Sequence, residues 1–237
     1  MNFFLRLFGK KPTLSVNPTF IDNFENLNNW IISTWSAPGT NSTHKGSFDE
    51  THVAVGTLGL CLKLTQSKDG SNFYSTGGEV TSKQSFGYGK YEFVVSASAN
   101  DLGQPISGSI TGCFNYRPAS ITEIDYEVEG LTSRSKFYQF TSWIRESIPN
   151  ETTAVLPMSS LQLPHHGFHR IAFVWTKGKI EFYRDGVLVA THMKIVPSVP
   201  APFLFNHWGT NDLNWGGLAT PGVDRFMYIK SFNFTPL

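Results

Sequence analysis

Glu123-Ile124-Asp125-Tyr126-Glu127 places a carboxylate at every second position of an otherwise apolar run. Alternate residues of a β-strand point to the same face, so this pattern predicts a strand that carries the three acids side by side. A strand surface normally avoids like charges so close together, because they repel one another. Two readings follow: the strand is a solvated acidic edge, or its three acids do chemistry together.

One reaction in particular needs two carboxyl groups flanking a bond, namely the cleavage of a glycosidic bond. Positions 123 and 127 lie roughly 13 Å apart along a strand that rises about 3.3 Å per residue. If each side chain leans inward by about 4 Å, the carboxyl groups end ~5 Å apart, which is the separation found in retaining glycosidases. The spacing therefore favours a catalytic pair over a solvated edge.

Strand patterns continue on both sides of this motif, and helix patterns are nearly absent. Leu60, Leu62 and Leu64 alternate on one face, and Asp185-Gly186 supplies the residues of a tight hairpin turn. Many short strands separated by Gly- and Pro-containing turns predict an all-β antiparallel sandwich. We expect strands at residues 52–56, 59–65, 78–83, 89–97, 107–116, 122–129, 136–144, 168–176, 179–184, 187–192, 202–208 and 224–234.

The composition narrows the classes of function. The chain has 237 residues, a net charge of +1 and 16% charged residues. It therefore lacks the surplus of basic residues that would indicate a nucleic-acid partner. Aromatic residues make up 14%, which suggests that some of them line a groove, where flat sugar faces stack on aromatic rings. No apolar stretch reaches the length of a transmembrane helix.

The chain shows no internal repeat or linker. We expect residues 1–17 to be an N-terminal extension and residues 18–237 to form one catalytic domain. The first residues lack the cleavage site of a signal peptide, because Arg6 interrupts the apolar run and a basic pair follows it. Cys61 and Cys113 lie in apolar alternating segments, which favours buried free thiols. The histidines show no zinc-ligand spacing.

With its neighbouring segments, the acidic motif resembles the active-site region of glycoside hydrolase family 16, in the variant whose strand has no extra bulge residue. The resemblance covers about residues 20–234. It implies a β-jelly roll of two curved antiparallel sheets, of the concanavalin A-like type. The segments that follow the family's order are residues 77–83, 86–92, 167–175, 180–186 and 205–209, with Trp215 beyond them.

The resemblance implies a role for each acid of the motif. Glu123 is expected to be the nucleophile, which forms a glycosyl-enzyme ester. Glu127 is expected to be the general acid and then the general base, while Asp125 assists the nucleophile. The charge of one ionised carboxylate raises the proton affinity of the other, and this separates the two roles. Glu129 continues the alternation, and we expect it to be peripheral.

Further positions are expected to bind the substrate. Asn206 and Trp208 are expected to meet the sugar, Trp208 by stacking, and Glu79 to bind a sugar hydroxyl. The aromatic side chains among these positions have an alternative role in the core. The remaining candidates are Phe114, Tyr116, Gln139, Thr141 and Trp143.

The chain departs from the family at several positions. Lichenases carry Trp where this chain has Ile121, and Arg where it has Thr81, which weakens the assignment to mixed-linkage glucan. The region matched to the family's convex calcium site, residues 226–229, has no carboxylate. We therefore expect no cofactor, and a weak structural calcium site or none.

These features favour a retaining endo-β-glucanase that acts by double displacement, with 1,3-1,4-β-glucan (lichenan) as the first substrate to try. A β-glucan or xyloglucan transglycosylase would use the same ester and pass the sugar to another chain. A non-catalytic carbohydrate-binding jelly roll is the third alternative, although a lectin has no need of clustered acids. We expect a polysaccharide as the partner, no membrane span, a monomer and an extracellular site of action.

Overall fold

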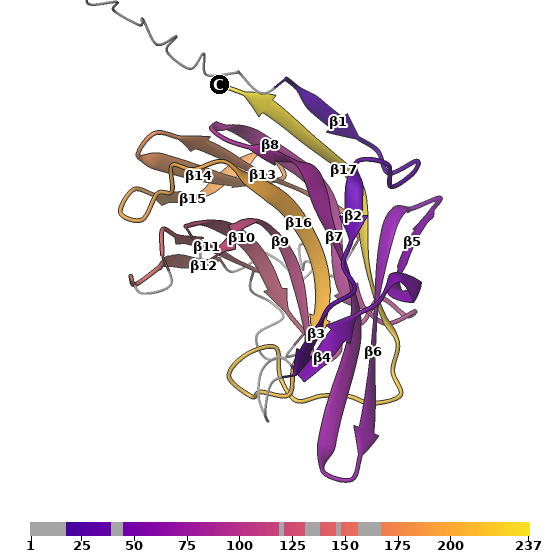
Figure 1. Ribbon diagram of the computed structural model, residues 1–237. Coiled ribbons are helices and arrows are strands. Elements are labelled where there is room, and N and C mark those ends of the chain that lie inside the picture. Colours follow the sequence, from indigo (N-terminus) through magenta and orange to yellow (C-terminus); the bar gives the residue numbers. More distant parts are fainter. Residues whose placement is uncertain (1–17, 39–44, 119–120, 131–137, 146–147, 156–166) are drawn as a thin grey trace, which may run out of the picture.

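The computed structural model describes residues 18–38, 45–118, 121–130, 138–145, 148–155 and 167–237 (Figure 1). The expected N-terminal extension at residues 1–17 lies outside this part of the chain. The described residues form β-strands and one short 3-10 turn, Glu50–His52, so the predicted all-β class is confirmed. Among them no helix is long and apolar enough to cross a membrane.

Two antiparallel layers make up the fold (Figure 1). We call them the outer sheet and the groove sheet. In the outer sheet the order is β5–β6–β17–β8–β13–β14–β15, with β1 beside β17. Its strands are β1 (Phe20–Asp22), β5 (Val53–Gly56), β6 (Gly59–Asp69), β8 (Gly89–Ala99), β13 (His169–Thr176), β14 (Lys179–Arg184), β15 (Val187–His192) and β17 (Arg225–Pro236).

In the groove sheet the order is β2–β7–β16–β9–β10–β11–β12. The first part of β7 also pairs with β6 and, in parallel, with β4, which pairs with β3. The strands of this layer and its β3–β4 hairpin are β2 (Trp30–Ile32), β3 (Ser36–Pro38), β4 (Lys45–Phe48), β7 (Asn72–Phe86), β9 (Ser109–Arg117), β10 (Thr122–Glu129), β11 (Tyr138–Trp143), β12 (Glu151–Val155) and β16 (Ala201–Gly209).

Every strand expected from the sequence is present. β10, β14 and β15 have the predicted ends, and the other strands differ at one or both ends. The strand expected from residue 52 begins at Val53, because the 3-10 turn occupies Glu50–His52. Five strands were not predicted, namely β1 to β4 and β12. They have three to five residues each, which is too short for an alternating pattern to stand out.

Aromatic rings from both sheets fill the space between them. Phe203 of the groove sheet stacks on Phe232 of the outer sheet with ring centroids 4.4 Å apart. Tyr126, on the inward face of β10, meets Phe93 of β8 edge to face at 5.9 Å. Most of the aromatic surplus seen in the sequence is therefore used in the core, and fewer rings remain for a groove. Burial of this apolar surface fixes which face of β10 points away from the core.

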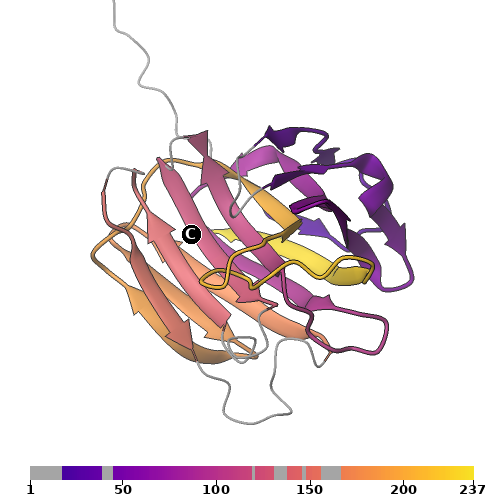
Figure 2. The ribbon, with the colours of Figure 1, turned by 90° about the horizontal axis from the view of Figure 1, so that it is seen from below.

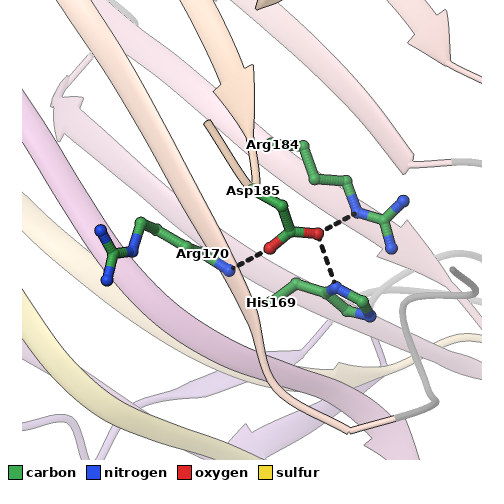
Figure 3. Close-up of polar contacts among 4 residues, drawn as sticks. All are labelled: His169, Arg170, Arg184 and Asp185. Atoms are coloured by element: carbon green, nitrogen blue, oxygen red, sulfur yellow. Dashed lines mark hydrogen bonds and ion pairs between the residues drawn. The ribbon is translucent and has the colours of Figure 1, made fainter. Parts of the chain in front are cut away.

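The predicted turn at Asp185-Gly186 joins β14 to β15 directly, and both residues have positive φ, 50° and 85°. A two-residue turn of this kind matches the twist of the paired strands. Figure 3 shows how the Asp185 carboxylate holds the turn, accepting a hydrogen bond from the Arg170 amide at 2.9 Å and lying 2.9 Å from His169 Nδ1. The turn thereby ties β13 to the end of β14.

A buried histidine links the two sheets. His207 of β16 places Nδ1 2.8 Å from the carbonyl oxygen of Leu62 in β6 and Nε2 2.8 Å from Ser98 Oγ in β8. A carbonyl oxygen only accepts, so Nδ1 donates to it. Burial lowers the pKa of His207 to about 3, and the ring stays neutral between the sheets.

This histidine makes the fold sensitive to acid. The unfolded chain takes up a proton at His207 near pH 6.5, whereas the folded state does so near pH 3, so stability is lost as the pH falls between these values. The loss amounts to on the order of 1 kcal/mol per pH unit. We expect His207→Gln to flatten this part of the stability profile, measured by urea unfolding at pH 7, 6, 5 and 4. Parallel profiles for the two proteins would contradict the assignment.

Candidate active site

The three acids of the motif lie on one face of β10, as predicted. Ile124, Tyr126 and Val128 point the other way, into the core, and are at most 1% exposed. Glu123, Asp125 and Glu127 all line one groove of about 530 Å³. The solvated-edge reading is therefore wrong, because β10 is a central strand between β9 and β11.

The groove crosses five neighbouring strands of the groove sheet. Four inter-strand spacings of about 4.8 Å give a floor roughly 19 Å long. Its lining comes from β9, β10, β11, β12, β16 and the segments next to them: Phe114, Glu123, Asp125, Glu127, Gln139, Thr141, Trp143, Asn150, Thr152, Asn206, Trp208 and Trp215.

The strands beside β10 place the predicted substrate-binding residues opposite the acids. On β11, Trp143 faces Glu123, Thr141 faces Asp125 and Gln139 faces Glu127. On β9, Tyr116 faces Glu123 and Phe114 faces Asp125. Directly paired residues share a face of the sheet. Of these five side chains, Tyr116 alone does not contribute to the described lining of the groove.

The environment of Glu127 favours its protonated form. Burial raises the pKa of this carboxyl from 4.5 to about 7, and the charges of Glu123 and Glu129 act in the same direction. A hydrogen bond from Gln139 Nε2 to Glu127 Oε2, 3.2 Å long, opposes them by stabilising the charged form. A carboxyl group with such a pKa can hold a proton near neutral pH and donate it to a leaving group.

Asp125 lies deeper than its neighbours and is 5% exposed. Burial raises its pKa well above the usual value, the charges of Glu123 and Glu127 raise it further, and a hydrogen bond with Trp143 lowers it. A protonated Asp125 between two glutamates is able to donate a hydrogen bond to one of them.

Asn206 reaches the groove because its neighbour across the sheet has no side chain. In register, Asn206 of β16 lies opposite Gly112 of β9, which in turn lies opposite Glu127. A Cβ atom on Gly112 would collide with Asn206 Oδ1. The other end of the amide donates from Nδ2 to Glu79 Oε2 at 3.2 Å. Gly112 and Glu79 thus hold the Asn206 side chain in the groove, with only Gly112 of β9 between it and Glu127 in register.

The structure places Glu79 on the groove face of β7, opposite Asn206 in register, where it is 5% exposed. Besides Asn206, its carboxylate accepts hydrogen bonds from Ser33 Oγ at 2.6 Å and Trp35 Nε1 at 3.2 Å. Direct binding of a sugar hydroxyl by Glu79 stays a prediction. Its observed contacts orient Asn206 and Trp35.

A smaller hollow of about 90 Å³ adjoins the groove and shares Asn206 and Trp208 with it. Trp35 and Phe48, from the β3–β4 hairpin and its approach, form its far wall with ring centroids 5.1 Å apart. Sequence reasoning missed Trp35, Asn150 and Thr152, which lie in or beside strands too short to predict. Trp215, noted in the sequence without a role, also lines the main groove.

The described residues contain no group of three or more His, Cys, Asp or Glu side chains that could hold a metal ion. The weak or missing calcium site therefore stays a prediction. Both cysteines are free thiols, Cys113 buried and Cys61 partly buried.

Carboxyl groups side by side in an open groove are the arrangement that most glycoside hydrolases use. Residues 40–217 match the model of glycosyl hydrolases family 16, and the chain belongs to this family. The resemblance inferred from the acidic motif is thereby confirmed.

Curated relatives cover most of the chain. The endo-1,3-1,4-beta-glycanase ExoK of Rhizobium meliloti is 30% identical over 92% of this chain and 78% of its own length. A beta-glucanase of Paenibacillus macerans is 30% identical over 83% of this chain and 75% of its own length.

Solved structures confirm the jelly roll. The beta-glucanase of Bacillus licheniformis superposes with a TM-score of 0.79 at 23% identity, covering 93% of this chain and 99% of that chain. The Crh5 transglycosylase superposes with a TM-score of 0.70 at 20% identity, covering 93% and 85%. At these identities the superpositions establish the fold.

The close approach at Gly112 gives a direct test of the site's packing. We expect Gly112→Ala to displace the Asn206 amide and to destabilise the fold by about 1–3 kcal/mol, as overpacking does. Urea unfolding measures the change. Gly56→Ala is the matched control, because nothing lies within 4 Å of a Cβ at that position. Equal losses for the two variants would show that Gly112 is not a tight site.

Proposed function

We propose that this protein is a retaining endo-β-glucanase that hydrolyses internal bonds of 1,3-1,4-β-glucan. The observation that carries the proposal is the set of three acids that lie on one face of β10 and line one groove. The pKa of one of them, Glu127, is raised to about 7. The proposed enzyme acts as a monomer outside the cell, where polymeric glucans occur.

In the proposed first step, the Glu123 carboxylate attacks the anomeric carbon and forms a glycosyl-enzyme ester. Glu127 gives its proton to the glycosidic oxygen, so that the leaving chain departs as a neutral alcohol. In the second step Glu127, now ionised, takes a proton from water, and the resulting hydroxide displaces Glu123. Two inversions at the same carbon give net retention.

Asp125 has a supporting role within this proposal. In its neutral form it donates a hydrogen bond to Glu123 and adds no third negative charge to the site. Burial and the two flanking carboxylates raise the pKa of Asp125 and so favour this form.

The length of the groove supports an endo-acting enzyme. The main groove crosses β12, β11, β10, β9 and β16, and the adjoining hollow continues over β7 and β4. The acids lie on the middle strand of the main groove, so binding surface extends on both sides of them. A polymer that lies across the strands would be cut within its length.

The choice of 1,3-1,4-β-glucan is supported by the relatives, one of which is named an endo-1,3-1,4-beta-glycanase. Two positions argue for testing other glucans beside it. Ile121, 43% exposed, stands where lichenases have a stacking Trp, and Thr81 replaces an Arg. A panel of lichenan, laminarin, cellulose and xyloglucan, read out by reducing sugar, tests the substrate. Longer oligosaccharides formed from a short donor would favour a transglycosylase.

Replacement of Glu123 tests the nucleophile. We expect Glu123→Gln to lower kcat by at least ~10³-fold, because an amide does not attack the anomeric carbon, while the melting temperature stays within a few degrees. Undiminished turnover in this variant would remove the assignment.

Azide distinguishes the two glutamates further. In Glu123→Ala it should restore turnover and give an α-glycosyl azide from an activated β-glycoside. In Glu127→Ala the product should be the β-azide. The reverse pattern, seen by proton NMR, would exchange the two roles.

The hydrogen bond from Gln139 should set the alkaline limit of activity. Glu127 donates only while protonated, so kcat/KM should fall as the pH rises through about 7. Gln139→Leu removes the hydrogen bond that favours the ionised form, and we expect the alkaline limb to move to higher pH. Thr152→Ala, at the other side of the groove, should leave the limb in place. A shift to lower pH in Gln139→Leu would contradict this account.

A further inference from the structure

Glu129, which the sequence analysis regards as peripheral, is a buried carboxylate on the groove face of β10. It is the fourth acid of the alternation and is 6% exposed. Its partner in register on β9 is Ile110, which is fully buried although it also belongs to this face. At this end of β10 the groove sheet is therefore covered by another part of the chain.

The cover is the segment that follows β16, residues 210–224, which we call the Trp215 loop. In Figure 2 this segment, orange to yellow, passes over the groove sheet. The Gly216 amide donates to Glu129 Oε2 at 2.8 Å, and the Gly216 carbonyl accepts from the Gly108 amide at 2.8 Å. Gly216 has φ +73°, and a Cβ there would press on Thr210 and Ile110. The residue next to Trp215 is thus closely held on the sheet.

The base of the Trp215 loop is held by a separate set of contacts. Gln66 Oε1 accepts from the Thr220 amide at 2.8 Å and from Arg225 at 2.7 Å, and Arg225 also donates to the Thr220 carbonyl at 2.9 Å. These bonds would survive a change at Glu129. At the tip, Glu129 supplies a side-chain bond from the groove sheet, beside the backbone bond from the Gly108 amide. Bonds within the loop add to them, from the Asn214 amide to Asp212 Oδ1 and from Thr210 Oγ1 to the Gly217 carbonyl.

The chemistry of this bond favours a carboxylate over an apolar residue. Burying an ionised carboxyl group is costly unless donors satisfy it. A backbone N–H that meets a carboxylate forms a charge-assisted bond about twice as strong as a neutral one. The bond therefore fixes the tip more firmly than packing alone, and Trp215 lines the same groove as Glu127.

We propose that Glu129 is a positioning residue, whose carboxylate holds the Gly216 amide and so fixes Trp215 as a sugar-binding wall at the Glu127 end of the groove. This inference rests on the proposed function for the role of Trp215. Glu129 has a second effect through its charge, which favours the protonated form of Glu127.

Two substitutions separate the hydrogen bond from the charge. Glu129→Leu removes both, whereas Glu129→Gln keeps an acceptor oxygen and removes the charge. We expect Glu129→Leu to raise KM for the glucan about tenfold, with a smaller change in kcat, because the lost bond is to a charged group. Glu129→Gln should restore KM to within about threefold of the wild type. In both variants the alkaline limb of kcat/KM should move to lower pH.

A double-mutant cycle tests whether Glu129 acts through Trp215. In a Trp215→Ala background, Glu129→Leu should raise KM no further, because the wall it positions is already gone. Additive effects on KM, or a wild-type KM in Glu129→Leu, would overturn the proposal.

Hydrogen exchange tests the same contact without any catalytic readout. Residues 210–224 should exchange faster in Glu129→Leu than in the wild type and Glu129→Gln. Glu151→Leu is the matched control, because Glu151 accepts from the amides of Lys194 and Ile195 at 2.8 and 3.0 Å. In Glu151→Leu, the amides of Lys194 and Ile195 should exchange faster, and the Trp215 loop should stay protected. Unchanged exchange in Glu129→Leu would refute the positioning role of Glu129, whereas a wild type inactive on every glucan would refute the proposed function alone.

Discussion

Repulsion among the carboxylates of β10 is the constraint on which the site depends. Three acids share one groove, a fourth follows them on the same face, and Asp125 and Glu129 are almost fully buried. Four neighbouring carboxyl groups cannot all be ionised at once in a region of low dielectric constant, because their charges repel one another. Burial and repulsion raise the pKa values of Glu127 and Asp125 instead, while hydrogen bonds from Gln139, Trp143 and the Gly216 amide stabilise the carboxylates that are ionised. The repulsion that destabilises the strand also prepares one acid to donate a proton.

The aromatic core makes this arrangement rigid. Inward residues of β10 pack on rings from the outer sheet, so the strand cannot slip by one residue without turning its acids into the core. His207 and the stacked pair Phe203 and Phe232 join the sheets at β16, the strand that carries Asn206 and Trp208. The positions of the groove side chains thus depend on packing on the opposite face of the same strands.

Sequence reasoning predicted the parts of the fold that follow a local rule. The acids of β10 share a face because side chains alternate along a strand, and Asp185-Gly186 forms a tight turn because both residues tolerate positive φ. It missed the short strands β1 to β4 and β12, and with them Trp35, Asn150 and Thr152. A strand of three to five residues gains its stability from neighbours distant in sequence, and its own residues carry too little pattern to reveal it.

The sequence by itself determined the strand that bears the acids, the face on which they lie and the family to which the chain belongs. Tertiary structure decided what surrounds them. Glu79 accepts a hydrogen bond from Asn206, and the missing side chain of Gly112 leaves room for that amide. Glu129 meets a backbone amide 87 residues away in sequence. Contacts of this kind depend on which strands become neighbours in the sheet. Pairing between strands distant in sequence is set by burial of the whole core, which no local pattern specifies.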